Sequence, residues 1–450
     1  MLTLLEIFLV IASLLLTIQS AYSASIMLYA WEDEDRQQRN RVPQDFGPPR
    51  LSFTLLLPAR HEEAVIQGTI QRLVDLNYPP ELVQLLIIIE ATDSGTIEAV
   101  NQKLAELHRA GVTNVRLLTY NDPPVNKPHG LNVGLAQATG DVITIFDAED
   151  EPHPDILAIV NTVMLREELQ VVQCGVQLMN FADRWYSSLN VLEYFFWFRS
   201  RLHFHSLVNM VPLGGNTIFI KYDVLKSMGG WDQNCLTEDA DIGVRLSVAG
   251  LPIRVLYDDR YVTREETPPT VSQFIKQRTR WNQGFLQVLA KKDWQHLPLL
   301  RQRLLAFYTL AFPCLQALLL VYLPLSLWMM LFLRLPSPIA IISLFPIYML
   351  GLQLIANVVG LFEFAAVHHL TIPPRLPTKM ALVFLPYQFL LSFAAFRAIQ
   401  RQFKGKNNWE KTVHTGALRK PDLNTIGSRP DYSIAISSVL TNEALAGEEE

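Results

Sequence analysis

The sequence has only three cysteines among its 450 residues, Cys174, Cys235 and Cys314, and no two of them form a CxxC pair. A disulfide framework or a cysteine-ligated zinc site is therefore not expected, and a reducing compartment is indicated. Charged residues are also scarce, at 18%, and the net charge is −5. Nucleic-acid binding requires clustered positive charge, so a nucleic-acid partner is not expected either.

Apolar residues are abundant instead, at 50% of the chain, and the mean hydropathy is +0.17. This composition is typical of a protein with membrane segments. Residues 1–30 are nearly all apolar and lack a basic start, which predicts an N-terminal transmembrane anchor, with a cleaved signal peptide as the alternative. Further membrane helices are expected within residues 300–400, at Leu304–Leu333, Pro338–Ala366 and Met380–Phe396. Four apolar stretches and no array of intramembrane charges are too little for a transporter.

Basic residues flank the first and the last apolar stretch. Arg36, Arg39, Arg41 and Arg50 fall within the linker at 31–50, and Arg397, Arg401 and Lys404 follow the last stretch. The positive-inside rule assigns both groups to the cytoplasm. Both assignments cannot hold if each C-terminal stretch crosses once, so one stretch lies in the interface or Leu304–Leu333 forms a hairpin at Pro313 and Pro324. The tail at 401–450 is expected to be cytoplasmic and disordered after about residue 420.

The region between the membrane segments, residues 51–290, alternates apolar runs with helical periodicity. This order predicts an α/β domain with a mostly parallel sheet covered by helices on both faces. Ligands bind at the carboxyl ends of the strands in such sheets. The expected strands are Leu51–Leu57, ending at Pro58, and Val83–Ile89, Val115–Leu118 and Val142–Phe146.

Polar residues follow the first two of these strands. Pro58 and Glu62 close the first strand, where they would line a nucleotide pocket or simply form a loop before a helix. Glu90 and Asp93 close the second, where carboxylates would accept hydrogen bonds from a base or ribose. The alternative for Asp93 is a cap on the next helix.

Three carboxylates, Asp147, Glu149 and Asp150, directly follow the strand at 142–146. Their mutual repulsion would be relieved by a hard cation, Mg²⁺ or Mn²⁺, which prefers oxygen ligands and often bridges to a diphosphate. No basic residue is expected near the cluster, so a cation is expected to be required there. A solvated acidic loop is the alternative.

Two further clusters lie nearer the C-terminal end of the region. Glu238 and Asp239 follow Thr237, and a carboxylate there would act as general base on a hydroxyl or would belong to a helix cap. A helix expected near 271–289 carries the second cluster. Arginine pairs with phosphate oxygens and tryptophan offers a platform for a sugar ring, although the helix would also suit the membrane interface. This second cluster comprises Gln277, Arg278, Arg280 and Trp281.

Taken in order, these segments resemble the family 2 glycosyltransferases, in particular the membrane synthases that include cellulose and hyaluronan synthases. The family's D, DxD, TED and QxxRW motifs have counterparts in Asp93, Asp147 with Glu149, Thr237–Asp239 and Gln277–Trp281. Lys127 is in a loop similar to the family's lysine-bearing loop. The Asp-Ala-Glu-Asp sequence and Pro212–Gly215 also resemble bacterial exopolysaccharide transferases.

The resemblance implies a Rossmann-like GT-A fold and a nucleotide-diphosphate sugar, usually linked to UDP, as donor. It implies that Asp239 is the catalytic base and that Asp147 and Glu149 hold the metal, with Asp150 as the other candidate for the second ligand. The implied donor-binding residues are Pro58, Glu62, Glu90, Asp93, Lys127 and Asp147, and the implied diphosphate and acceptor residues are Glu238, Gln277, Arg278, Arg280 and Trp281.

The predicted function is transfer of the sugar to a growing polysaccharide. Inversion is expected, because one base without a carboxylate nucleophile suits a single displacement. Transfer of one sugar to a membrane lipid is the first alternative. A receptor that binds a nucleotide sugar without catalysis is an alternative of another class. The resemblance implies a bacterial plasma membrane with the catalytic domain on the cytoplasmic side.

Overall fold

The computed structural model describes residues 2–31, 33, 35–36, 41–333 and 335–410, and the side chains from residue 4 onward. The tail for which disorder was predicted lies outside the described residues, as does Arg39. A seven-stranded sheet forms the centre of the α/β part, in the order β3-β2-β1-β4-β7-β5-β8. Only β7 is antiparallel to its neighbours, so the predicted mostly parallel sheet is confirmed. The strands are β1 (Phe53–Ala59), β2 (Val83–Glu90), β3 (Val115–Tyr120), β4 (Val142–Ile145), β5 (Val171–Cys174), β7 (Ile218–Lys221) and β8 (Ile253–Leu256).

The expectation that the first strand stops at Pro58 is wrong, because β1 continues through Pro58 to Ala59. Its pairing with β4 ends at Leu56, whereas its pairing with β2 runs on to Ala59. Proline lacks a backbone N–H and is tolerated in a strand where no neighbour needs that donor. Pro58 therefore lies where β1 has become a strand with a partner on one side.

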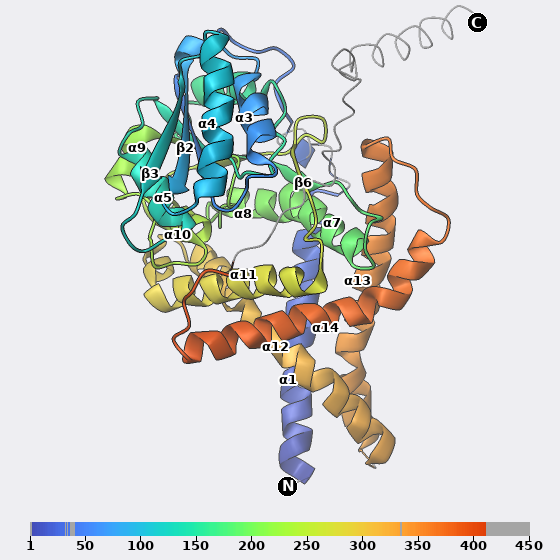
Figure 1. The fold of residues 1–450 in the computed structure, drawn as a ribbon. Helices are drawn as coiled ribbons and strands as arrows, with labels where there is room; N and C mark the ends of the chain where they lie inside the picture. Colours follow the sequence, from blue (N-terminus) through green and yellow to red (C-terminus); the bar gives the residue numbers. More distant parts are fainter. Residues whose placement is uncertain (1, 32, 34, 37–40, 334, 411–450) are drawn as a thin grey trace, which may run out of the picture. The chain divides into compact units, whose positions relative to one another are not determined.

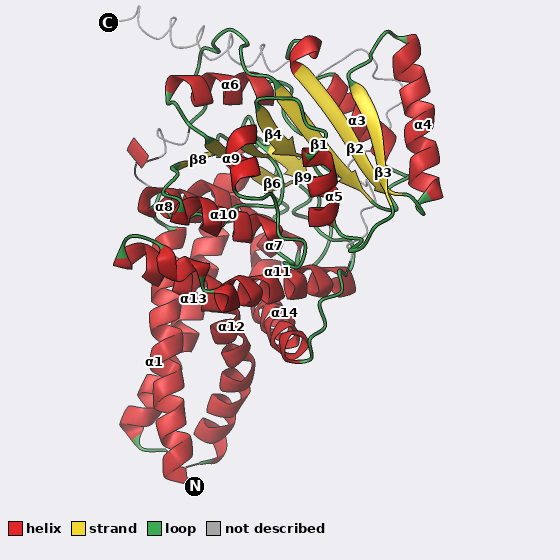
Figure 2. Ribbon diagram, turned by 90° about the vertical axis from the view of Figure 1, so that its left-hand side faces the viewer, coloured by secondary structure: helices red, strands yellow, loops and turns green. Residues whose placement is uncertain are grey.

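Helices cover both faces of the sheet, and the alternation of side chains along β1 separates the two layers. Leu55 and Leu57 pack in one cluster with residues of α3 (Ile66–Val74), α4 (Ser94–Arg109) and α6 (Ile156–Arg166). Leu56 packs in the other, with α5 (Lys127–Leu135) and α10 (Glu238–Val248). Figure 2 shows the strands above the helices of the membrane segments, with α5 on the near side of the sheet.

The remaining elements connect the sheet to the membrane segments. They include a two-stranded sheet of β6 and β9 and several short helices between β5 and β8. Their bounds are β6 (Val176–Leu178), β9 (Thr263–Glu265), α7 (Ser187–Phe196), α8 (Leu202–Val208), α9 (Tyr222–Ser227) and the single-turn helices η1 (Pro80–Leu82), η2 (Trp197–Arg201) and η3 (Asp293–His296). Helix α11 (Val271–Lys291) confirms the helix that was expected near 271–289.

Four helices of the described residues are long and apolar enough to cross a membrane: α1 (Leu2–Met27), α12 (Leu300–Phe332), α13 (Ser337–Val367) and α14 (Leu376–Phe403). Helix α12 is continuous through Pro313 and Pro324, so a hairpin within Leu304–Leu333 is wrong. Both figures show α1, α12 and α13 extending together beyond the α/β part, whereas α11 and α14 lie across them (Figures 1 and 2). Helices α11 and α14 pack along each other.

Candidate active site

A cavity of about 530 Å³ opens at the carboxyl ends of β1 and β4 and continues between the membrane helices. Most of the residues that the motifs single out line this cavity. They are Pro58, Glu62, Lys127, Asp147, Glu149, Glu238, Asp239, Gln277, Arg278, Arg280 and Trp281. The sheet thus brings together side chains from β1, α5, the β4 loop, α10 and α11, as ligand sites at the strand ends of an α/β sheet require.

The acidic loop after β4 has a cation beside it. Lys127, at the start of α5, lies with its Nζ 2.6 Å from Asp147 Oδ1 and donates a hydrogen bond of 2.9 Å to the Gly215 carbonyl. The carboxylates of Asp147, Glu238 and Asp239 raise the pKa of Lys127, although burial opposes this. The expectation that no basic residue lies near the cluster is therefore wrong, because α5 approaches this loop only in the folded chain.

The three carboxylates of this loop do not share one environment. Asp150 is fully buried, and it accepts hydrogen bonds from the Asp147 backbone N–H at 2.7 Å and from Asn216 Nδ2 at 2.8 Å. Burial raises the pKa of Asp150 well above its usual range. Asp150 therefore stabilises the loop through buried hydrogen bonds, whereas Asp147 and Glu149 face the cavity.

The acidic pair Glu238 and Asp239 begins α10. Burial raises the pKa of Glu238 to about 8, and the neighbouring Asp239 carboxylate adds to the shift. Burial also raises the pKa of Asp239, although Lys127 and Arg280 favour its charged form. Asp239 Oδ1 accepts a hydrogen bond of 2.8 Å from the next residue, Ala240, and a Cβ atom at Gly215 would lie 3.4 Å from Asp239 Oδ2.

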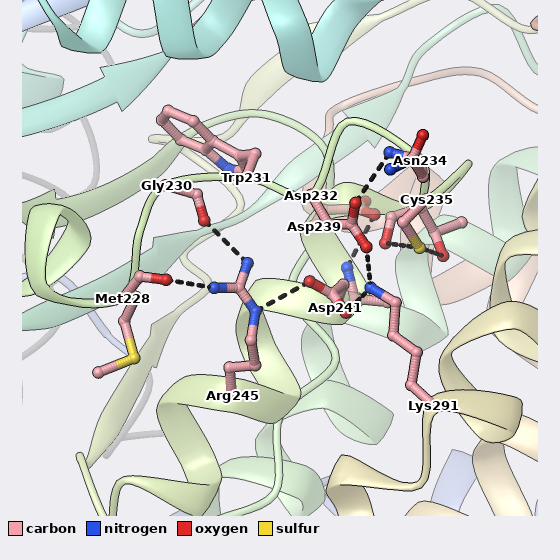
Figure 3. Close-up of polar contacts among 12 residues, drawn as sticks. Met228, Gly230, Trp231, Asp232, Asn234, Cys235, Asp239, Asp241, Arg245 and Lys291 are labelled. Atoms are coloured by element: carbon pink, nitrogen blue, oxygen red, sulfur yellow. Dashed lines mark hydrogen bonds and ion pairs between the residues drawn. The ribbon is translucent and has the colours of Figure 1, made fainter.

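Thr237 is at the N-cap position of α10 and Asp239 is in its first turn, as the capping alternative expected, but the Thr237 side chain makes no cap hydrogen bond in the described structure. Instead, α10 is fixed by a buried ion network on its other side (Figure 3). Asp241 is 1% exposed and lies 2.5 Å from Lys291 Nζ of α11 and 2.9 Å from Arg245 Nε. Lys291 also pairs with Asp232, and Arg245 donates to the carbonyls of Met228 and Gly230. The network therefore anchors α10 to α11 and to the Gly-Gly-Trp loop.

The arginines of α11 face different neighbours. The Arg280 guanidinium carbon lies 4.4 Å from the centroid of the Trp409 ring. The negative charges of Glu238, Asp147 and Asp239 favour its charged form. Arg278 pairs instead with Glu193 of α7 at 2.5 Å, and its guanidinium lies 4.5 Å from the ring of Trp281. Arg280 therefore faces the acidic cluster, whereas Arg278 holds α11 to α7 at the cavity wall. Gln277 Oε1 is buried there and has no hydrogen-bond partner among the described residues.

Glu90 and Asp93 are not among the cavity-lining residues. Asp93 is 3% exposed and caps α4, since its carboxylate accepts hydrogen bonds from the backbone N–H of Thr96 at 3.3 Å and of His61 at 2.6 Å. Its pKa is lowered by those backbone donors, although burial opposes them. The helix-cap alternative for Asp93 is thus confirmed. Glu90 lies 3.8 Å from Arg60 at the end of β2.

Several cavity residues were missed by sequence reasoning. Trp409 follows the last apolar stretch in a polar segment, and Asn216 directly follows the Pro212–Gly215 segment. An isolated tryptophan among polar residues was the only local signal for Trp409. The polar residues on the membrane helices, namely Gln19, Ser23, Gln316, Gln353, Asn357 and Gln388, carried no motif at all.

The described residues contain no group of three or more His, Cys, Asp or Glu side chains placed to hold a metal ion. Asp147 and Glu149 nevertheless both face the cavity and supply the carboxylate oxygens that Mg²⁺ and Mn²⁺ prefer. Such a cation commonly completes its coordination with water and donor phosphates in sites of this kind. The two carboxylates fit a metal that is shared with a diphosphate.

Comparison with known proteins finds glycosyltransferases. Relatives include a probable glycosyltransferase, YdaM, of Bacillus subtilis, 26% identical over 261 residues, and a beta-monoglucosyldiacylglycerol synthase of Nostoc, 28% identical over 236 residues. A poly-beta-1,6-N-acetyl-D-glucosamine synthase of Staphylococcus epidermidis is 24% identical over 276 residues. These matches cover 57%, 52% and 60% of this chain. The chain spans 60%, 49% and 62% of the relatives' own lengths.

Among solved structures, a mannosyltransferase of Pyrobaculum calidifontis in complex with GDP-Man and Mn²⁺ superimposes with a TM-score of 0.52. It is 20% identical, and the match covers 88% of this chain and 99% of that chain. The fold is therefore GT-A. The sequence profile of the family described as "Glycosyltransferase like family 2" matches residues 48–284. Since this match spans more than half of the 450 residues, the chain belongs to the family 2 glycosyltransferases.

Proposed function

We propose that this glycosyltransferase is an integral membrane enzyme that moves a sugar from a nucleotide-diphosphate donor, expected to be a UDP-sugar, to a membrane lipid. The observation that carries the proposal is the single cavity that links Asp239 to the membrane helices. Along α12, its lining runs from Tyr308 to Leu319, which corresponds to about 16 Å of helix.

The depth of this cavity favours a lipid over a polymer channel. Its lining ends at Leu16 of α1, Leu319 of α12 and Leu350 of α13, near the middle of each helix. A hydrocarbon core is about 30 Å thick, so the cavity spans roughly half of it. A lipid can extend its headgroup from this depth to Asp239, whereas export of a polymer needs a path across the whole membrane.

The residues at the cavity's upper end suit an inverting displacement. Asp239 would take the proton of the acceptor hydroxyl, and Lys127 and Arg280 would bind the diphosphate that leaves. Asp147 and Glu149 would hold Mg²⁺ or Mn²⁺, which supplies positive charge to that diphosphate when bound. Glu238, with a pKa of about 8, keeps its proton at neutral pH and leaves Asp239 as the base of the pair.

The assignment of the donor pocket rests on Pro58, Glu62, Lys127 and Asp147, all of which face the cavity. Gln277 and Trp281 would contact the sugar or the acceptor from α11. Asp93 and Glu90 would act indirectly, by fixing the ends of β2 and α4 beside the pocket. This indirect role replaces the direct donor contacts that the motif implies.

The test is transfer by the purified full-length protein in lipid nanodiscs, with a panel of labelled nucleotide sugars. We expect label in the chloroform–methanol phase, loss of transfer in EDTA, and recovery with Mn²⁺ or Mg²⁺. Label in ethanol-insoluble polymer would overturn the lipid acceptor in favour of polysaccharide synthesis. Donor binding without any transfer would support the receptor alternative, and full activity in EDTA would refute the metal assignment.

A further inference from the structure

An arginine outside the family motifs lines the membrane side of the cavity. Arg201 ends η2 and faces a part of the cavity that we call the membrane arm, between α1, η2 and α12, lined by Gln19, Ser23, Trp197, Arg201, Tyr308 and Phe312. Its Nη2 donates a hydrogen bond of 2.8 Å to Ser23 Oγ of α1. The guanidinium is thus held at the wall of the arm, on the side of the membrane helices.

Three other cations that line the cavity lie near carboxylates, whereas Arg201 has no such partner at ion-pair distance among the described residues. Lys127 pairs with Asp147, and Arg278 pairs with Glu193. Arg280 lies near Glu238 and Asp239. In the described part of the chain, by contrast, no carboxylate lies within ion-pair distance of Arg201.

The neighbours of Arg201 leave its charge largely unbalanced. The carboxylate of Glu193 acts on Arg201 from beyond ion-pair distance, but it pairs with Arg278 at 2.5 Å. His205 also lines this arm, and burial lowers its pKa to about 4, so it is neutral at pH 7. Ser23 and Tyr308 are neutral hydroxyls that join α1 to α12. A purely structural contact between these helices would need only such neutral groups, because a desolvated cation without a counterion destabilises the fold. An anionic ligand in the arm would balance the charge.

We propose that Arg201 binds the phosphate of a membrane lipid, and that the lipid which accepts the sugar carries this anionic group. The claim that this lipid accepts the sugar rests on the proposed function. The claim that Arg201 binds a lipid phosphate does not. The guanidinium offers paired donors that match phosphate oxygens. The arm also contains Leu16 and Phe312, which would contact the lipid chains, so an amphiphile fits it better than a free phosphate ion.

The experiment measures binding by calorimetry to the detergent-purified full chain, without donor, below the micelle concentration of each probe. The probes are 1-decanoyl-glycerol 3-phosphate, 1-decanoyl-glycerol and glycerol 3-phosphate, which separate the phosphate from the chain. We expect the first probe to bind roughly 10- to 100-fold more tightly than the second, because charge-assisted hydrogen bonds are lost in the second. Glycerol 3-phosphate should bind weakly.

The variants are Arg201→Gln and Arg201→Lys, with Arg260→Gln as a control for the change in charge, since Arg260 is exposed and pairs with Asp258. Arg201→Gln should lower the affinity for 1-decanoyl-glycerol 3-phosphate to that for 1-decanoyl-glycerol. Arg201→Lys and Arg260→Gln should still bind 1-decanoyl-glycerol 3-phosphate more tightly than 1-decanoyl-glycerol. Equal binding of the two decanoyl probes to the wild-type protein would overturn the proposal without any variant. A preference that survives in Arg201→Gln would overturn it too.

Two further results bear on the source of the phosphate and on the proposed function. Binding of glycerol 3-phosphate as tight as that of the decanoyl phosphate would refute a lipid ligand. Donor affinity, measured on the same preparations, should be unchanged in Arg201→Gln. If the phosphate preference holds but no donor supports transfer, the proposed function fails and the binding site for the lipid phosphate remains.

Discussion

Glu238 and Asp239 are adjacent in the sequence, yet only one of them can serve as a base at neutral pH. Both carboxyl groups are buried at the start of α10, and burial raises both pKa values. Two interacting acids of this kind lose their protons in separate steps. The positive charges of Lys127 and Arg280 lie beside the two carboxyl groups and favour loss of the first proton from the pair. Burial thus favours a proton on the pair, whereas Lys127 and Arg280 favour a negative charge on it.

Replacing the proposed base separates chemistry from binding. Asp239→Asn keeps the size of the side chain but removes the proton acceptor, so turnover should fall by roughly 10²–10⁴-fold. Donor affinity by calorimetry should stay near that of the wild type. Asp147→Asn is the matched comparison, and it should weaken donor and metal binding together. Near-normal turnover of Asp239→Asn would remove the base assignment.

The raised pKa of Glu238 also predicts how stability depends on pH. The group has a pKa of about 8 in the folded chain and 4.5 ordinarily, so the folded state binds more protons between these values. The contribution of Glu238 to the free energy of unfolding should therefore fall as pH rises from about 4.5 to about 8.

Glu238→Gln mimics the protonated side chain and isolates this effect. Thermal unfolding in detergent should give equal midpoints for wild type and variant near pH 4.5, and a higher midpoint for the variant above about pH 8. A difference that does not change with pH would show that Glu238 titrates normally in the fold.

Helices α10 and α11 carry the TED and QxxRW motifs, and their contact sets the distance between the two. Gly284 of α11 packs on Thr237, which precedes α10, and a Cβ atom at Gly284 would lie 2.3 Å from Thr237 Oγ1 and 2.7 Å from Thr237 Cβ. The ion network around Asp241 joins the same two helices (Figure 3). The arrangement of Asp239 and Arg280 depends on this close approach.

Enlarging Gly284 should therefore disturb both motifs at once. Gly284→Ala should destabilise the protein by about 1–3 kcal/mol, as overpacking of a tight contact does, and should reduce turnover. Gly351→Ala in α13 is the control, because no atom lies within 4 Å of its added Cβ. Thermal unfolding and transfer are measured on both. Equal behaviour of the two variants would contradict a rigid contact between α10 and α11.

Helix α14 lies across α1, α12 and α13, which suggests an arrangement that would satisfy both basic groups (Figure 1). If α1, α12 and α13 each cross the membrane once and α14 lies in the interface beside α11, the residues near Arg50 and those near Lys404 would share one side of the membrane. Both groups then obey the positive-inside rule. We expect that side to be the cytoplasm, where the donor sugar is available.

Single cysteines test this topology in intact cells with an impermeant thiol reagent. The background carries Cys314→Ser, because Cys314 is the exposed native cysteine, whereas Cys174 and Cys235 are buried. Ser337→Cys, at the first residue of α13, should react from outside. Asp45→Cys and Lys404→Cys should react only after the cells are permeabilised. Labelling of Lys404→Cys in intact cells would mean that α14 crosses the membrane.

Local sequence patterns located the main strands and helices that carry the motifs. Periodicity located β2 and α11 within one or two residues, and the order of Asp147, Asp239 and Arg280 indicated the family. Such signals are local, because they depend on the alternation of side chains and on the residue types a short segment contains.

The side chains that face each other are known only from the folded chain. Folding places Lys127 against Asp147, buries Asp150 and leaves Arg201 in the membrane arm. Composition alone could not distinguish α14, which lies crosswise, from the other three apolar helices. These features arise from contacts between residues far apart in the chain, and their energies depend on packing and burial that no local pattern contains.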